Sequence, residues 1–128
     1  MENRRIETQR LMLRSITQED APAVFAWASD PEVNRYMPYP LHKSIEDTRA
    51  WIASITPDML EFGFCRKDSG QLIGTGGVGK NEEGVHTLGY NLRHDAWGYG
   101  YATEAAQAML AWAYHSLGVR DFVLDHAV

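Results

Sequence analysis

Small residues gather where a strand pattern gives way to a helix pattern, and this position favours anion binding. Gly98, Gly100 and Ala102 alternate with aromatic residues as the helical spacing begins. The first N–H groups of a helix have no partner within the helix, and its dipole places partial positive charge there. Without larger side chains in the way, a phosphate can approach these donors. We therefore predict that the phosphates of any cofactor bind at residues 97–103.

A second glycine-rich segment competes for the same role. Residues 74–79 read G-T-G-G-V-G and follow the apolar pair Leu72-Ile73. The dinucleotide fingerprint needs a helix directly after its glycines, whereas a turn-forming segment, residues 80–84, follows here. We interpret residues 74–79 as a glycine-rich strand that allows close packing or a bulge, and not as a phosphate site.

The elements that would position residues 97–103 follow from periodicity. Alternating apolar residues separated by turns predict an antiparallel meander over residues 61–66, 71–78 and 85–92. A helix is expected over Tyr101–Leu117, with Gly118 as its C-terminal cap, and a last strand over Val119–Val128. Because this helix connects two strands as a crossover, we predict that those strands are parallel neighbours.

The first sixty residues predict one strand and two helices. Apolar alternation indicates a strand over residues 11–16. Residues 17–20 have the form of a capping box, although Asp20 is an alternative cap, and Ser29-Asp30-Pro31 ends the helix that follows. Residues 44–47 repeat the capping pattern and open a second helix. The predicted order is β-α-α-β-β-β-α-β, an α+β fold.

Composition limits the possible functions. With 128 residues the chain has the length of one domain, and its net charge of −5 argues against a nucleic-acid partner. The single cysteine, Cys65, excludes an internal disulfide and lies in an apolar run, which favours a buried structural thiol. We expect no signal peptide, membrane span or metal site, and a cytoplasmic location.

Two segments together resemble the acetyl-CoA-binding core of the GNAT N-acetyltransferases. They are residues 88–92, L-G-Y-N-L, and residues 97–105, W-G-Y-G-Y-A-T-E-A. Residues 7–14 and 29–33 are similar to the branch of that family that acetylates the N-termini of ribosomal proteins. The resemblance implies a GNAT fold for residues 1–128 as a single domain, with a mixed, mostly antiparallel sheet flanked by helices.

The same resemblance implies an acetyl-CoA site. The family's pyrophosphate loop falls on residues 97–102, and the strand over residues 85–92 would run beside the pantetheine arm. An amine would attack the thioester directly, and a backbone N–H near Leu92 could stabilise the oxyanion. The implied cofactor-binding residues are Leu92, Arg93, Trp97, Gly98, Tyr99, Gly100, Tyr101, Ala102 and Thr103.

The general base is not evident from the sequence. Many family members carry a glutamate on the strand before Gly-Tyr, where this chain has Thr87, which cannot act as a base near neutral pH. A histidine has a suitable intrinsic pKa, but strand alternation points His86 to the opposite face. His126, in the last predicted strand, is a second candidate, and both are better explained as surface or packing histidines. A water relay is the alternative, so the catalytic residues stay unassigned.

The implied reaction moves acetyl from acetyl-CoA to a primary amine, with a protein N-terminal α-amine as the expected acceptor and a small-molecule amine as the alternative. In this family Tyr36, Met37 and Tyr39 would border the acceptor, although packing also explains them. The family's domain continues past Val128, so we expect a C-terminally truncated chain. Such a chain is either active, completed by a second copy through strand exchange in a homodimer, or an inactive CoA-binding fragment.

Overall fold

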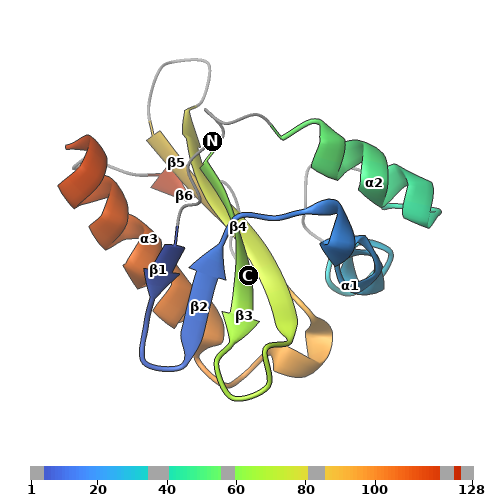
Figure 1. The fold of residues 1–128 in the computed structure, drawn as a ribbon, viewed down its shortest axis with the longest axis horizontal. Coiled ribbons are helices and arrows are strands. Elements are labelled where there is room, and N and C mark those ends of the chain that lie inside the picture. The colour runs from blue at the N-terminus through green and yellow to red at the C-terminus, as the bar shows by residue number, and fades with distance from the viewer. Residues whose placement is uncertain (1–4, 35–40, 56–59, 81–85, 119–122, 125–128) are drawn as a thin grey trace.

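The computed structural model describes residues 5–34, 41–55, 60–80, 86–118 and 123–124 (Figure 1). The strands are β1 (Arg5–Glu7), β2 (Leu11–Arg14), β3 (Leu60–Arg66), β4 (Leu72–Lys80), β5 (His86–Leu92) and β6 (Val123–Leu124). The helices are α1 (Ala21–Ala28), α2 (Ile45–Ala53) and α3 (Tyr101–Leu117), with 3-10 turns η1 (Gln18–Asp20) and η2 (His94–Ala96). The strands form one sheet in the order β1-β2-β3-β4-β5-β6.

The sheet confirms the predicted meander and crossover. β2 to β5 pair antiparallel, whereas β6 pairs parallel with β5 after the chain has passed through α3. β1, which pairs antiparallel with β2, was not predicted, because three residues are too few to show alternation. The predicted turn at residues 81–84 lies outside the described residues, as does most of the predicted last strand, of which β6 is the described part.

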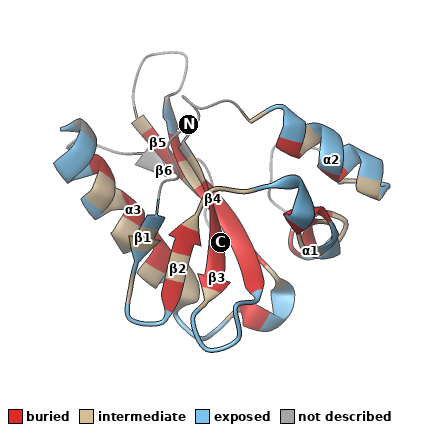
Figure 2. Cartoon of the chain, viewed as in Figure 1, coloured by how far each residue is buried: buried red, intermediate tan, exposed pale blue. Residues whose placement is uncertain are grey.

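The helices pack on opposite faces of the sheet, with α3 on one face and α1 and α2 on the other (Figure 1). Residues coloured as buried lie along the sheet and in all three helices, which also carry exposed residues (Figure 2). On the α3 face the core includes Leu11, Leu13, Phe62, Phe64, Ile73, Val78, Leu88, Leu92, Ala105, Met109 and Ala113. On the other face it includes Val24, Trp27, Ala28, Val33, Cys65 and Leu72.

The helix α3 has the predicted bounds because its local signals are strong. Ala105, Met109 and Ala113 recur every four residues and are fully buried against the sheet. Gly118 ends the helix with φ +70°, a left-handed conformation that glycine adopts without strain, and its N–H donates to the carbonyl of Tyr114 at 3.1 Å.

The predicted capping box at residues 17–20 is confirmed, but it opens the 3-10 turn η1 and not the α-helix directly. Thr17 is the N-cap residue of η1, and Asp20 is the N-cap residue of α1, as the alternative had it. The Asp20 carboxylate accepts the Thr17 N–H at 2.8 Å and pairs with Arg14 at 2.9 Å. Ser44 caps α2 as predicted.

The glycines of β4 are packing residues, as predicted. A Cβ on Gly74 would lie 2.5 Å from the carbonyl oxygen of Asn91, and a Cβ on Gly76 would lie 2.6 Å from Phe64. The register between β3 and β4 also shifts at Phe64/Cys65, as a bulge does. Residues 74–79 therefore form a closely packed strand, and the next described element is β5.

Cys65 is the cysteine that the sequence predicted to be a buried structural thiol. Cys65 is a buried free thiol, and burial raises its pKa, which keeps it protonated and unreactive. No helix in the described part of the chain is long and apolar enough to cross a bilayer. No cluster of potential metal ligands occurs among the described residues. The predicted acceptor-loop residues Tyr36, Met37 and Tyr39 and the candidate base His126 lie outside the described residues.

Candidate active site

The loop between η2 and α3 has a backbone that only glycine adopts easily. Gly98 has φ +84° and Gly100 has φ +80°, both in the left-handed region. Both residues are exposed, and nothing lies within 4 Å of the position that a Cβ on Gly98 would take. The loop therefore presents bare backbone at the start of α3, as the spacing of Gly98, Gly100 and Ala102 predicts.

The N–H groups of this loop make no hydrogen bond within the described part of the chain. The first hydrogen bond of α3 runs from the Glu104 N–H to the Gly100 carbonyl at 3.0 Å. None of the N–H groups of residues 98–103 donates a hydrogen bond to any described residue. Six consecutive donors at the positive end of a 17-residue helix form the arrangement that binds phosphate groups.

Three other predicted cofactor-binding residues differ from residues 98–103, because they already make hydrogen bonds within the protein. They are Leu92, Arg93 and Trp97. The Trp97 indole Nε1 donates to the Leu92 carbonyl at 3.1 Å. The Arg93 N–H donates to the Ile73 carbonyl at 2.8 Å, and the Arg93 carbonyl accepts the Ala96 N–H at 3.0 Å. These bonds fix the path of the chain from β5 into the loop. The role of the three residues in cofactor binding stays a prediction.

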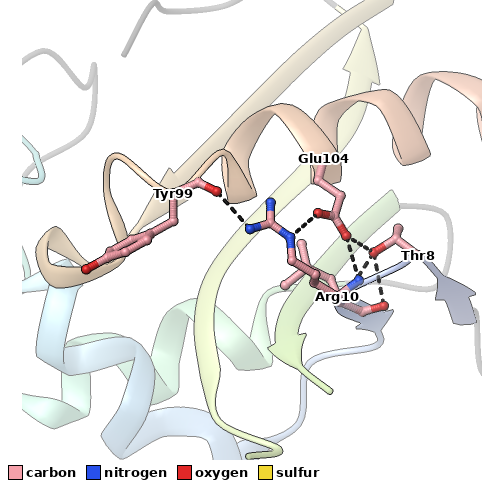
Figure 3. A network of polar contacts seen from close by, with 5 residues as sticks. Thr8, Arg10, Tyr99 and Glu104 are labelled. Carbon is pink, nitrogen blue, oxygen red and sulfur yellow. Dashed lines mark hydrogen bonds and ion pairs between the residues drawn. The ribbon is translucent and has the colours of Figure 1, made fainter. Parts of the chain in front are cut away.

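Arg10 and Glu104 secure the loop to the β1–β2 hairpin, a contact that the sequence did not reveal (Figure 3). Arg10 donates from Nη1 to the Tyr99 carbonyl at 2.9 Å and from Nε to Glu104 at 2.7 Å. The second Glu104 oxygen accepts the Arg10 backbone N–H at 2.8 Å and the Thr8 hydroxyl at 2.5 Å. Segments about ninety residues apart in the sequence are thereby joined at the start of α3.

This network also determines the ionisation of Glu104, which lies beside the N–H groups of the loop. Burial alone would raise the pKa of Glu104, but the hydrogen bonds from Thr8 and Arg10 outweigh that effect and lower the pKa. Glu104 is therefore ionised at neutral pH, and Arg10 neutralises it at 2.7 Å. The Arg10 guanidinium also lies 4.5 Å from the centre of the Tyr101 ring. A phosphate at the loop would meet a neutral pair instead of an isolated carboxylate.

The face of the sheet opposite α3 carries a group of polar side chains. Thr75, Thr87 and Asn91 are buried there, with Thr87 and Asn91 on β5 and Thr75 on β4. Asn91 donates from Nδ2 to Oδ1 of Asn34 at 3.5 Å. His86 precedes Thr87 and belongs to the other face of β5, as strand alternation predicts.

Glu61 shares this face, and sequence reasoning did not single it out. It lies on β3 opposite Gly77 and is partly buried. Burial raises the pKa of its carboxyl group to about 7. A shift of that kind is common at functional sites but depends on tertiary packing, so residue type and spacing do not disclose it.

Comparison with known proteins identifies the family. A model of the acetyltransferase (GNAT) domain matches residues 10–128. The chain belongs to the GNAT acetyltransferase family. It is 34% identical over 119 residues to the "uncharacterized N-acetyltransferase p20" of Bacillus licheniformis, covering 88% of this chain and 67% of that protein. It is 32% identical over 121 residues to the "uncharacterized N-acetyltransferase YoaA" of Bacillus subtilis, covering 89% and 68%.

Solved GNAT structures have the same fold. A GNAT-family acetyltransferase from Bacillus anthracis superposes with a TM-score of 0.85 and 25% identity, covering 94% of this chain and 72% of that one. These similarities confirm the predicted α+β GNAT fold, with its mostly antiparallel sheet flanked by helices. GNAT enzymes generally use acetyl-CoA.

Proposed function

We propose that this chain is an acetyl-CoA-dependent N-acetyltransferase whose pyrophosphate site is formed by residues 98–103. The observation that carries the proposal is the run of N–H groups at the start of α3, none of which donates to a described residue. Arg10 supports it by holding the Tyr99 carbonyl away from the space that an anion would enter. Backbone recognition also suits a chain with a net charge of −5, which has no excess of cationic side chains.

The acceptor in this proposal is a primary amine, and specifically a protein N-terminal α-amine. A structure described as the RimL ribosomal L7/L12 α-N-protein acetyltransferase has the same fold, with a TM-score of 0.79 and 16% identity over 97% of this chain and 72% of that one. The fold is therefore compatible with such an acceptor. A small-molecule amine is the second candidate, because the GNAT fold by itself does not select the acceptor.

The proposed chemistry is direct transfer. The neutral amine attacks the thioester carbonyl carbon, the carbon–sulfur bond breaks, and the thiolate leaves and takes up a proton. Hydrogen-bond donors aimed at the developing oxyanion would stabilise the transition state. The Arg93 N–H is already engaged with Ile73, so the donor must be a different N–H near the end of β5, or a water.

Two measurements test the proposal. Calorimetry with acetyl-CoA, and with NADH as a control nucleotide, should show saturable binding of acetyl-CoA alone. Absence of binding at millimolar acetyl-CoA would contradict the cofactor assignment.

A thiol-release assay then separates the candidate acceptors and the inactive fragment. Peptides with a free N-terminus should release CoA faster than the same peptides with an acetylated N-terminus. Faster release with small amines than with peptides would favour the second candidate. Binding without thiol release from any amine would instead favour an inactive CoA-binding fragment. The mass in solution shows whether a homodimer forms.

A further inference from the structure

Three residues form a straight row across the middle of the sheet. Glu61 on β3 is the register partner of Gly77 on β4, and Gly77 is the register partner of Gly89 on β5. Register partners in a sheet project to the same face, so all three belong to the face opposite α3. Because neither glycine has a side chain, nothing on β4 or β5 in this row stands between the Glu61 carboxyl and the surface above β5.

The distance from Glu61 to Gly89 is short enough for the Glu61 carboxylate to reach toward a substrate above β5. Adjacent strands lie roughly 5 Å apart, so the Cα atoms of Glu61 and Gly89 are separated by about 10 Å. A glutamate side chain laid across Gly77 spans much of that distance. On the proposed function we place the acetyl thioester beside β5, because this strand leads through η2 into the phosphate loop.

The helix α1 covers a different part of this face from the part that contains Glu61 and Gly77. α1 packs against Cys65 and Leu72, at the opposite end of the β3–β4 pair from Glu61 and Gly77. The side chains that share the face with Glu61 on β4 and β5 are polar but uncharged: Thr75, Thr87 and Asn91. These side chains are buried, so the space above the two glycines has polar walls and not those of an apolar core.

No charged group in the described part of the chain competes for the Glu61 carboxyl. On β2 the nearest cation, Arg14, is bound to Asp20 through two hydrogen bonds. On β3 itself the other titratable group of this face is Cys65. α1 contains no titratable side chain, and those of α2, Glu46, Asp47 and Arg49, are exposed. Glu61 has no hydrogen bond or ion pair with another described residue.

We propose that Glu61 is the general base that removes the proton from the acceptor amine. This inference rests on the acetyltransferase function proposed above. The amine arrives as an ammonium ion, and the Glu61 carboxylate accepts one of its protons. The resulting neutral amine forms the new carbon–nitrogen bond as the thioester carbon–sulfur bond breaks. After the attack the nitrogen carries a positive charge and gives up a second proton, which the leaving thiolate takes, while Glu61 passes the first proton to solvent.

The ionisation of Glu61 agrees with that role. Burial raises its pKa to about 7, so the carboxylate is a stronger base than an exposed glutamate and is still largely ionised slightly above neutral pH. General bases work best when their pKa lies near the working pH. Thr87 and His86 do not meet the need, since a threonine does not titrate in this range and His86 belongs to the α3 face.

The test compares the wild type with Glu61→Gln, Glu61→Asp and Glu19→Gln as a matched control on an exposed glutamate of η1. Glu61→Gln keeps the shape of the side chain but cannot accept a proton. We expect kcat to fall about 100-fold or more, with the Kd for acetyl-CoA within about twofold of the wild-type value. The wild-type rate should rise with pH through about 7, and this limb should vanish in Glu61→Gln. Glu19→Gln should match the wild type.

The outcomes separate this inference from the proposed function. Wild-type thiol release together with near wild-type turnover by Glu61→Gln overturns the Glu61 assignment alone. Failure of the wild type to bind acetyl-CoA or to release thiol overturns the proposed function, and the Glu61 assignment with it. If Glu61→Gln does not fold, Glu61→Asp decides. A carboxylate shortened by one methylene should lose about tenfold in kcat and keep the pH limb, and an unchanged kcat would contradict the inference.

Discussion

Arg10 donates a hydrogen bond to the backbone carbonyl of Tyr99 at 2.9 Å and thereby sets the direction in which the loop before α3 presents its polar groups. A carbonyl oxygen that faced the phosphate site would repel an anion. Held by the guanidinium, the Tyr99 oxygen faces the β1–β2 hairpin instead (Figure 3). The same guanidinium binds Glu104 in the first turn of α3. Arg10 thus binds both the Tyr99 carbonyl oxygen and the Glu104 carboxylate, which lie next to the N–H donors of the loop.

Arg10→Met should weaken acetyl-CoA binding by about three- to tenfold, because the loop loses its anchor and Glu104 becomes an uncompensated charge near the phosphates. The free energy of unfolding should also fall by about 1–3 kcal/mol. Calorimetry and urea denaturation measure the two effects. Lys67→Met is the matched control, since Lys67 also pairs with a carboxylate of the hairpin region, Glu7, whose side chain is 63% exposed against 18% for Glu104. It should change stability by less than about 1 kcal/mol and leave binding unaltered.

Gly100→Ala should reduce acetyl-CoA affinity about tenfold. Its Cβ would lie 3.4 Å from Nη2 of Arg10 and would project from a backbone with φ +80°. Gly70→Ala is a matched control, because Gly70 has φ +73° in the β3–β4 turn with nothing within 4 Å. Both variants should lose about 1–2 kcal/mol of stability from left-handed strain. Equal losses of affinity in the two variants would contradict a phosphate site at the loop.

The sequence predicted the elements whose signals are local. Glycine-containing turns and short-range alternation defined β3, β4 and β5, and the four-residue spacing of small and apolar residues defined α3. The same local chemistry predicted the bare loop at Gly98 and Gly100. These features were accessible because each depends on residues within a few positions of one another.

The remaining features depend on contacts between distant segments. Arg10 and Glu104 are 94 positions apart, and only the return of α3 against β1 and β2 brings them together. Glu61 looks like an ordinary polar position at the edge of a strand, and its raised pKa comes from packing that the sequence does not specify locally. For the same reason β1 was missed, since three residues become a strand only through pairing with β2.

Asp20→Asn should destabilise the protein by about 2 kcal/mol at pH 7, since Arg14 and the Thr17 N–H would lose a charged acceptor. Burial tends to raise the pKa of Asp20, but its bonds to Arg14 and Thr17 prevail and lower it below the usual 3.8. A lowered pKa contributes stability above the unfolded-state pKa and loses it as the pH falls through the folded-state value. The difference from wild type should therefore shrink at pH 2. Urea denaturation at both pH values checks this, with Asp68→Asn, at an exposed pair, as the control.

For Glu61 we expect a pH dependence of stability opposite to that of Asp20. Its pKa is raised from 4.5 to about 7, so the folded protein holds this proton more tightly than the unfolded chain does. Stability should therefore decrease as the pH rises from about 4.5 to 7, by at most about 3 kcal/mol. Glu61→Gln should flatten this slope and should be more stable than the wild type at pH 8. Thermal denaturation from pH 5 to 8 measures it without any substrate, and identical slopes in both proteins would place the pKa of Glu61 near its ordinary value.

Gly74→Ala should be among the most destabilising single methyl additions in the sheet. The new Cβ would lie 2.5 Å from the Asn91 carbonyl oxygen and 2.8 Å from a methyl of Leu92, so β4 and β5 would have to separate. We expect a loss of about 2–3 kcal/mol, as for other overpacked sites. Gly79→Ala on the same strand is the control, because its Cβ would meet only the Thr87 hydroxyl, at 3.5 Å. Urea denaturation should leave that variant within about 1 kcal/mol of wild type, since alanine there relieves the entropic cost of glycine in a strand. If both variants lost similar amounts of stability, the close approach of β4 and β5 at Gly74 would not be the cause, because Gly79 has no such approach.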